Sequence, residues 1–191
     1  MISSRRIRLA VIFLVFATSS TVRAEEPVVK AINASETLGA PSIIVVTPQG
    51  TPGSRLKSSS PLIQNTLLPA LLSGAAVKII LQENSNNVIH RVEPFALGHV
   101  TKVVFDGDYY VSRIATQRKK DGTDEHLEVF LKKIGDKSET AYNVYNPLLQ
   151  QLLIAAFSGS HGPVPLRVDV KFDGKNIVTA TLGEKDHTGS K

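Results

Sequence analysis

The sequence contains no cysteine, no tryptophan and a single methionine among its 191 residues. The absence of cysteine excludes a disulfide framework, a cysteine-ligated zinc or iron–sulfur site and cysteine nucleophile chemistry. Charged residues are also few, at 20%, whereas 42% of the residues are hydrophobic, so the composition is not that of a disordered chain. A chain of this length forms one domain or two small ones.

The N-terminus has the features of a signal peptide. Three arginines precede an apolar run over residues 9–17, which is shorter than the about 20 apolar residues that a membrane-spanning helix needs. Val22-Arg23-Ala24 then provides the small residues that precede a cleavage site. The sequence therefore predicts cleavage between Ala24 and Glu25, export to the periplasm or the extracellular space, and no stable membrane span afterwards.

The positive charge of the chain belongs mostly to this predicted signal peptide. Residues 1–24 hold four of the 22 Lys and Arg residues and no acidic residue, which leaves 18 basic against 17 acidic residues. Binding of nucleic acid needs a basic stripe with stacking aromatics, and a nearly balanced chain lacks that excess. We therefore expect no nucleic-acid partner.

Residues 25–60 are rich in Pro, Gly, Ser and Thr. This composition predicts a flexible tether with one edge strand at most, at residues 42–46. An α+β domain is expected to follow over residues 61–183, and a polar tail over residues 184–191.

Two segments predict amphipathic helices that begin in the same way. Ser60-Pro61 and Asn146-Pro147 each place a capping residue before a proline at the first helical position. Ser73-Gly74 and Ser158-Gly159 then predict the helix ends.

Alternating apolar and polar residues between 76 and 133 predict an antiparallel β-meander. Asp106-Gly107 is a hairpin signal, expected to join a strand over residues 99–105 to one over 108–114. A further hairpin is expected around Asp121-Gly122. The predicted fold class is therefore α+β, an antiparallel meander sheet with two helices.

The end of the chain repeats features of its middle. Pro61-Leu62-Ile63-Gln64 matches Pro147-Leu148-Leu149-Gln150, and Val77-Lys78-Ile79 falls on Leu166-Arg167-Val168. A duplicated helix–hairpin unit would explain the match. The alternative is that two common helix–hairpin units occur in one α+β domain.

The histidines do not predict a metal site. None of the five lies three or four residues from another, so no helical metal-binding pair exists, and we expect no cofactor. His90 and His99 on neighbouring strands, with Glu93, match a two-histidine, one-carboxylate set in composition only. Surface strand residues are the favoured interpretation.

Ser158-Gly159-Ser160-His161-Gly162 places hydroxyl groups beside an imidazole. A nucleophile elbow needs its serine at a strand-to-helix turn, whereas Ser158 follows a helix. We interpret the segment as a helix end and a loop, and we predict no catalytic residue.

The tyrosines are the better candidates for a binding surface. Tyr109 and Tyr110 point to opposite faces of one strand, and Tyr142 and Tyr145 precede the second helix. Exposed tyrosines combine apolar area with a hydroxyl group, which suits recognition of proteins or sugars. The candidate binding residues are Tyr110, Tyr142 and Tyr145, although packing in the core would also account for them.

These observations favour an exported, non-enzymatic binding or assembly protein of the bacterial-type cell envelope or extracellular space, with a protein partner. One alternative is a hydrolase that acts on envelope glycan or peptide through carboxylates or His161. The other is a small-molecule carrier, which would need an apolar cavity between sheet and helices.

Overall fold

The computed structural model describes residues 27–37, 41–47, 53–94, 102–118, 125–159 and 166–184. The predicted signal peptide, with Ala24 and Glu25, lies outside these residues. Ten strands and two helices occur within them: β1 (Val28–Ser35), β2 (Ser42–Thr47), β3 (Ser54–Ser58), α1 (Pro61–Ser73), β4 (Val77–Leu81), β5 (Ile89–Pro94), β6 (Tyr109–Arg118), β7 (Glu125–Lys133), β8 (Thr140–Val144), α2 (Pro147–Gly159), β9 (Arg167–Asp173) and β10 (Asn176–Gly183).

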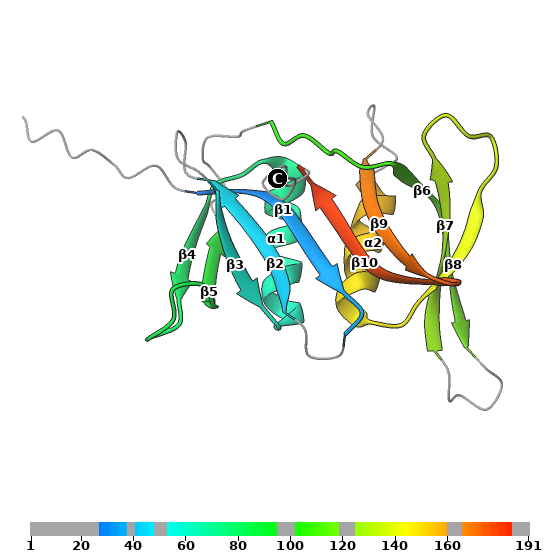
Figure 1. Ribbon diagram of the computed structural model, residues 1–191. Helices are drawn as coiled ribbons and strands as arrows, with labels where there is room; N and C mark the ends of the chain where they lie inside the picture. Colours follow the sequence, from blue (N-terminus) through cyan, green and yellow to red (C-terminus); the bar gives the residue numbers. More distant parts are fainter. Residues whose placement is uncertain are drawn as a thin grey trace, which may run out of the picture.

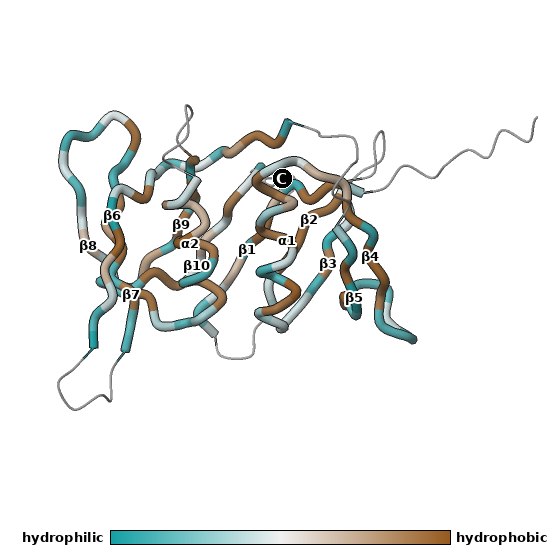
Figure 2. The backbone as a smooth tube through the Cα atoms, turned by 180° about the vertical axis from the view of Figure 1, so that it is seen from behind, coloured by the Kyte–Doolittle hydropathy of each residue, from teal (hydrophilic) through white to brown (hydrophobic). Residues whose placement is uncertain are grey.

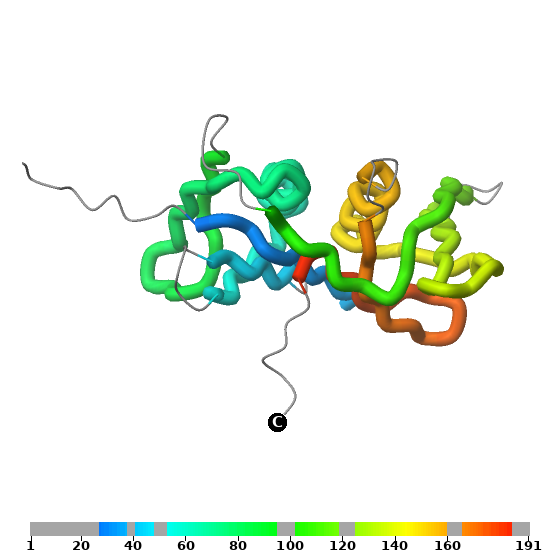
Figure 3. The backbone as a smooth tube through the Cα atoms, turned by 90° about the horizontal axis from the view of Figure 1, so that it is seen from above, coloured from blue at the N-terminus to red at the C-terminus, as the bar shows by residue number. Residues whose placement is uncertain are grey.

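The order of the elements repeats along the chain. Three strands, a helix and two strands occur first as β1 to β5 with α1, and then as β6 to β10 with α2. Both helices have 13 residues. The two halves lie side by side, with both helices on the same side of the strands (Figures 1 and 3). We call them the first barrel (residues 28–94) and the second barrel (residues 109–183).

The second barrel is closed. Its strands follow the order β10-β8-β7-β6-β9, and β9 pairs again with β10. β8 and β10 run parallel through Asn143 and Asn176, and the other neighbours are antiparallel. The sheet is therefore a closed barrel and not simply the predicted meander. The ring closes because β9 and β10 return to the edges of β6 and β8.

The first barrel has the same strand order with fewer closing contacts. β1, β2 and β3 pair in sequence. An antiparallel bridge between Val28 and Ala76 links β1 to the start of β4, and a parallel bridge between Lys57 and Val88 links β3 to the start of β5. The parallel contact is the counterpart of the one between β8 and β10.

Local irregularities recur at matching places. A β-bulge interrupts the first strand of each barrel, between Val29 and Ala31 in β1 and between Val111 and Arg113 in β6. A second pair of bulges interrupts the hairpins β4–β5 and β9–β10. The repeat thus extends beyond the predicted helix–hairpin unit to three strands, a helix and two strands.

Counted within each barrel, the strands follow the order 1-2-3-5-4-1. The third and fifth strands are parallel, and the helix lies between the third and the fourth. This is the topology of the OB-fold, a five-stranded Greek-key barrel. The described part of the chain therefore consists of two such barrels in tandem.

β1 and β10 join the two barrels. They pair antiparallel over five residue pairs, from Ala31–Gly183 to Ser35–Thr179. Gly183 has φ +117°, and a Cβ atom there would overlap the backbone oxygen of Lys30, so the close approach requires glycine. The pairing makes one continuous sheet through both barrels.

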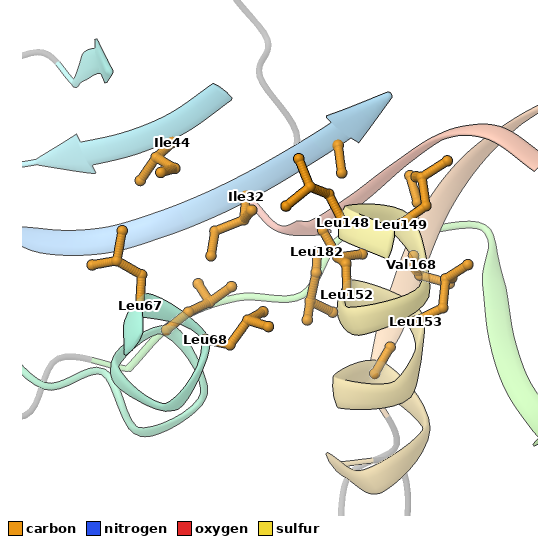
Figure 4. Packing of buried hydrophobic residues seen from close by; sticks show 14 of the residues in the cluster. Ile32, Ile44, Leu67, Leu68, Leu148, Leu149, Leu152, Leu153, Val168 and Leu182 are labelled. Carbon is orange, nitrogen blue, oxygen red and sulfur yellow. The ribbon is translucent and has the colours of Figure 1, made fainter. Parts of the chain in front are cut away.

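The buried apolar residues form one cluster that spans both barrels. Figure 4 shows Ile32 and Leu67 from the first barrel, and Leu152 and Leu182 from the second, in the same layer. All four side chains are inaccessible to solvent. Hydrophilic residues, in contrast, occupy the tip of the β4–β5 hairpin (Figure 2).

The predicted helix starts and the first helix end are confirmed. The Ser60 hydroxyl accepts a hydrogen bond from the Ile63 N–H, and Asn146 Oδ1 accepts one from the Leu148 N–H at 2.8 Å. Gly74 ends α1 in the left-handed conformation, with φ +68°. These signals are local, which is why the sequence alone reveals them.

The prediction of a tether over residues 25–60 is wrong for its described part. β2 confirms the strand expected at residues 42–46, but it lies between β1 and β3 and not at an edge, and β1 and β3 were not predicted. Val29, Ile32 and Ile44 are fully buried. Pairing of β1 with both β2 and β10 stabilises short strands in a segment whose prolines and glycines lie mostly between them. The predicted tail also starts too early, because Glu184 forms an ion pair with Lys30 at 3.0 Å.

The predicted hairpin at Asp106-Gly107 is also wrong. Residues 102–108 form no strand, and β6 begins at Tyr109. A Cβ atom at Gly107 would overlap the backbone of Val168, so this glycine permits a close approach of β9 instead of a turn. Asp121-Gly122 lies outside the described residues.

Candidate functional site

The pairing register divides β7 into two faces. Leu127, Val129 and Leu131 are buried inside the second barrel, so the alternate residues point away from the core. Register with β6 and β8 extends this outward surface across three strands. We call it the outer face; its residues are Tyr110, Arg113, Ala115, Gln117, His126, Glu128, Phe130, Lys132, Ala141 and Asn143, with Glu139 and Tyr145 flanking β8.

Arg113 lies on β6, beside Phe130 of the central strand β7. Its guanidinium lies over the Phe130 ring, with Cζ 3.7 Å from the centroid, and pairs with Glu139 at 3.2 Å. The Ser112 hydroxyl donates to Glu139 at 2.7 Å. Exposed contacts of this kind each contribute up to about 1 kcal/mol. Together they hold an arginine, an aromatic ring and a carboxylate in one orientation toward solvent.

Tyr145 lies at one end of this face, next to the N-terminus of α2. Its side chain is 40% exposed, and its ring centroid lies 5.0 Å from that of His126. The neighbouring Asn146 caps the helix, so the backbone beside Tyr145 is held by the helix start. Tyr145 therefore presents a positioned aromatic surface to solvent.

Tyr110 lies at the other end, between two cations. In the strand register it lies opposite Lys132 on β7 and opposite Arg167 on β9. Both cations are exposed, whereas Tyr110 is half-buried. The structure thus brings Tyr110 and Tyr145 to the same face, at its opposite ends.

Tyr142 does not reach the outer face. Its neighbour in the pairing is the buried Val129, and its ring stacks on Phe172 with centroids 4.3 Å apart. Tyr109 meets the same ring edge-on at 5.6 Å. The three aromatic residues pack against the core of the barrel, so Tyr142 contributes to the packing of the barrel and not to the outer face.

No family model matches the chain, and neither a curated protein nor a solved structure matches it. The OB topology therefore rests on the strand order, and a fold of this kind hosts many unrelated functions. OB barrels bind oligonucleotides and oligosaccharides on the face of their second and third strands. In the second barrel these strands are β7 and β8, which form most of the outer face.

The possible metal site of His90 and Glu93 finds no structural counterpart among the described residues, which contain no group of three potential metal ligands. His90 is exposed on β5, and His99 lies outside the described residues. The Glu93 carboxylate pairs with Lys78 at 3.3 Å and with Arg91 at 2.8 Å. Its charge is therefore already balanced by two cations.

Ser158 has a structural role in the last turn of α2. Its hydroxyl donates to the backbone oxygen of Ile154 at 2.9 Å, a common arrangement for serine in a helix. His161 lies outside the described residues. Within the described part of the chain, no helix is long and apolar enough to cross a membrane.

A hollow of about 390 Å³ lies beside the junction of the barrels. It is open to solvent, and four of its five lining residues carry polar side chains: Ser35, Glu36, Thr37 and Thr179, with Val178 as the fifth. A carrier of small apolar molecules needs an enclosed apolar cavity, which this hollow does not provide.

Sequence reasoning missed Arg113, Phe130 and Glu139. Phe130 carried a signal, because it alternates with Glu128 and Lys132 as an apolar residue on a polar face. Arg113 carried none, because its placement over Phe130 depends on the bulge in β6. Glu139 reaches Arg113 only through the return of β8.

Proposed function

We propose that this chain is a non-enzymatic binding or assembly protein that holds a protein partner on the outer face of its second barrel. The observation that carries the proposal is the group of Arg113, Phe130 and Glu139, fixed on a solvent-open face with Tyr145 at its end. Arginine and aromatic side chains are the residues that most often dominate the free energy of protein association.

The mixed charge of this face supports a protein partner over a nucleic acid. Arg113 is paired with Glu139, and Glu128 accepts a hydrogen bond from Gln117 at 3.2 Å. The exposed cations Lys132 and Arg167 lie together at the Tyr110 end of the face. A surface that binds nucleic acid would instead present cations free to reach phosphates along its length.

Export through a cleaved signal peptide remains part of the proposal. It rests on the apolar run over residues 9–17 and on the small residues before Glu25. The intact mass of the protein isolated from its own cells tests it. Loss of residues 1–24 is expected, and a full-length mass in an exported fraction would contradict the cleavage.

A duplicated unit of three strands, a helix and two strands is the origin we propose for the tandem barrels. The matching bulges in β1 and β6 support it, as do the caps Ser60 and Asn146 at equivalent helix starts. Low sequence identity between the halves does not argue against it, because packing and pairing preserve a barrel through many substitutions.

Affinity purification of the tagged protein from its own cells, with quantitative mass spectrometry, tests the binding surface. The double variant Arg113→Gln/Tyr145→Ser removes two anchors from the outer face, and each anchor contributes about 1–2 kcal/mol in typical interfaces. We therefore expect at least about a tenfold loss of the enriched partner.

A matched control removes an exposed arginine and an exposed apolar residue elsewhere. Arg91→Gln/Leu62→Ser does so in the first barrel, where Arg91 is exposed and Leu62 is 75% exposed. This control should retain the partner. Equal losses in both double variants, or no specific partner of the wild-type protein, would contradict the proposal.

A further inference from the structure

The first strands of the two barrels differ in how their edges are occupied. β1 has a strand on each side, β2 on one and β10 on the other. β6 has β7 on one side, but on the other side it pairs with β9 only at Tyr109 and Tyr110. Within the described part of the chain, the edge of β6 from Ser112 to Arg118 has no strand partner.

The matching bulges of β1 and β6 show which backbone N–H and C=O groups of β6 face its open edge. In β1, the Lys30 oxygen accepts from the Glu184 N–H at 3.0 Å, and the Glu36 N–H donates to the Val178 oxygen at 2.7 Å. Alternate residues from Lys30 to Glu36 therefore face β10. The residues at the same distances from the bulge of β6 are Ser112, Ile114, Thr116 and Arg118.

The matching helix of the first barrel leaves the corresponding edge open. α1 packs against β1, and the edge of β1 still pairs with β10; α2 packs against β6 as α1 does against β1. Proteins usually protect open edges with proline, with charged residues, above all lysine, or with a bulge. Residues 113–118 contain no proline and no lysine, and the bulge of β6 precedes them. They include two arginines, of which Arg113 is paired with Glu139.

The edge of β5, in contrast, is protected. The Val77 N–H donates a hydrogen bond to the Pro27 oxygen, so it points away from β5. Val77 and the facing Pro94 therefore form a pair without hydrogen bonds between β4 and β5. Pro94, which has no N–H, therefore faces the open side of β5. A second copy of the chain thus finds an unprotected strand at β6 and a protected one at β5.

We propose that β6 pairs antiparallel with β6 of a second copy, about a two-fold axis at Ala115. In this register Ile114 lies opposite Thr116, Arg113 opposite Gln117 and Ser112 opposite Arg118. No two like charges are opposed, and the backbone groups of Ile114 and Thr116 complement each other.

Such an interface uses the same patch on both copies, so it closes as a dimer. Pairing of the two edges makes β8-β7-β6-β6-β7-β8 one sheet, with the two outer faces side by side. The inference does not depend on the proposed function, because it rests on the edge of β6 and not on what the outer face binds.

Single cysteine variants test the register, because the described chain has no other thiol. Ala115 lies at the centre of the proposed pairing, in a pair without hydrogen bonds, where facing Cα atoms are about 4.5 Å apart. Ala115→Cys is therefore expected to form a disulfide dimer on mild oxidation. Gln117→Cys, on the same strand and face, should not, because its partner position is Arg113.

Sedimentation equilibrium of the wild-type protein provides the second measurement. We expect a mass that rises with concentration toward twice that of the monomer. Thr116→Pro should shift the equilibrium to monomer, because it removes an N–H that faces the open edge and not β7. A wild-type protein that stays monomeric, or Gln117→Cys dimers that form as readily as Ala115→Cys dimers, would overturn the inference.

Discussion

Gln64 connects the two barrels inside the core. This side chain has no exposed surface; it accepts a hydrogen bond from the Ser42 hydroxyl and donates one to the Leu148 oxygen at 2.7 Å. Its contacts thus extend from β2 to the first turn of α2. At the equivalent position of α2, Gln150 is half-buried and donates to the Val144 oxygen at 3.0 Å within its own barrel.

Gln64→Ala should lower the free energy of unfolding by about 2–4 kcal/mol, because it creates a cavity and leaves the buried Ser42 hydroxyl without its acceptor. Gln150→Ala should cost about 1 kcal/mol. Urea denaturation followed by circular dichroism measures both. Equal losses would show that Gln64 does not have the connecting role described here.

Positions 183 and 135 both favour glycine through their backbone conformation, and position 183 also lacks space for a side chain. Both have positive φ, but only at Gly183 would a Cβ atom overlap the neighbouring strand. Gly183→Ala should cost about 3 kcal/mol or more, and Gly135→Ala about 1 kcal/mol from backbone strain alone. Thermal unfolding of the two variants provides the comparison, and similar melting temperatures would contradict the tight junction.

At the scale of single elements, local sequence signals were sufficient to predict both helices but not several of the strands. Ser60-Pro61 and Asn146-Pro147 marked the helix starts because a cap is made by neighbouring residues. β3 carries one buried apolar residue, Leu56, and β1 pairs not only with the neighbouring β2 but also with β10, which is distant in sequence. Such pairing leaves little trace in the segment itself, so residues 25–60 were predicted as a tether with one strand at most, at residues 42–46, and β1 and β3 were missed.

The two helix caps should differ in strength. Asn146 Oδ1 accepts from two backbone N–H groups, of Leu148 at 2.8 Å and Leu149 at 3.3 Å, whereas the Ser60 hydroxyl accepts from Ile63 at 3.4 Å. We expect Asn146→Ala to cost about 2 kcal/mol and Ser60→Ala about 0.5 kcal/mol. Chemical denaturation checks the order. A larger loss for Ser60→Ala would contradict it.

At the scale of the whole molecule, two barrels share one sheet and one buried cluster. The sequence indicated the repeat but not its extent, because the bridges that close each barrel join strands far apart along the chain. The outer face was likewise only partly predictable. Alternation placed Tyr110 opposite Tyr109, but the grouping of Arg113, Phe130 and Glu139 needs the bulge and the return of β8.

The shared core predicts that the barrels unfold together. The chain has no tryptophan, and its four tyrosines, Tyr109, Tyr110, Tyr142 and Tyr145, all lie in or beside strands of the second barrel. Tyrosine fluorescence therefore reports the second barrel, whereas far-ultraviolet circular dichroism reports both. We expect the two urea transitions to coincide. A fluorescence midpoint distinct from that of circular dichroism would mean that the barrels unfold separately.

The binding role of the outer face is the central claim, and site-specific photocrosslinking in living cells tests it most directly. A photoreactive amino acid at Tyr145 or Lys132 lies on the outer face, and one at Leu62 or Val104 lies on other exposed surfaces. We predict a discrete crosslinked partner from the first two positions and none from the other two. The same product from all four positions, or products from Leu62 and Val104 alone, would contradict the claim.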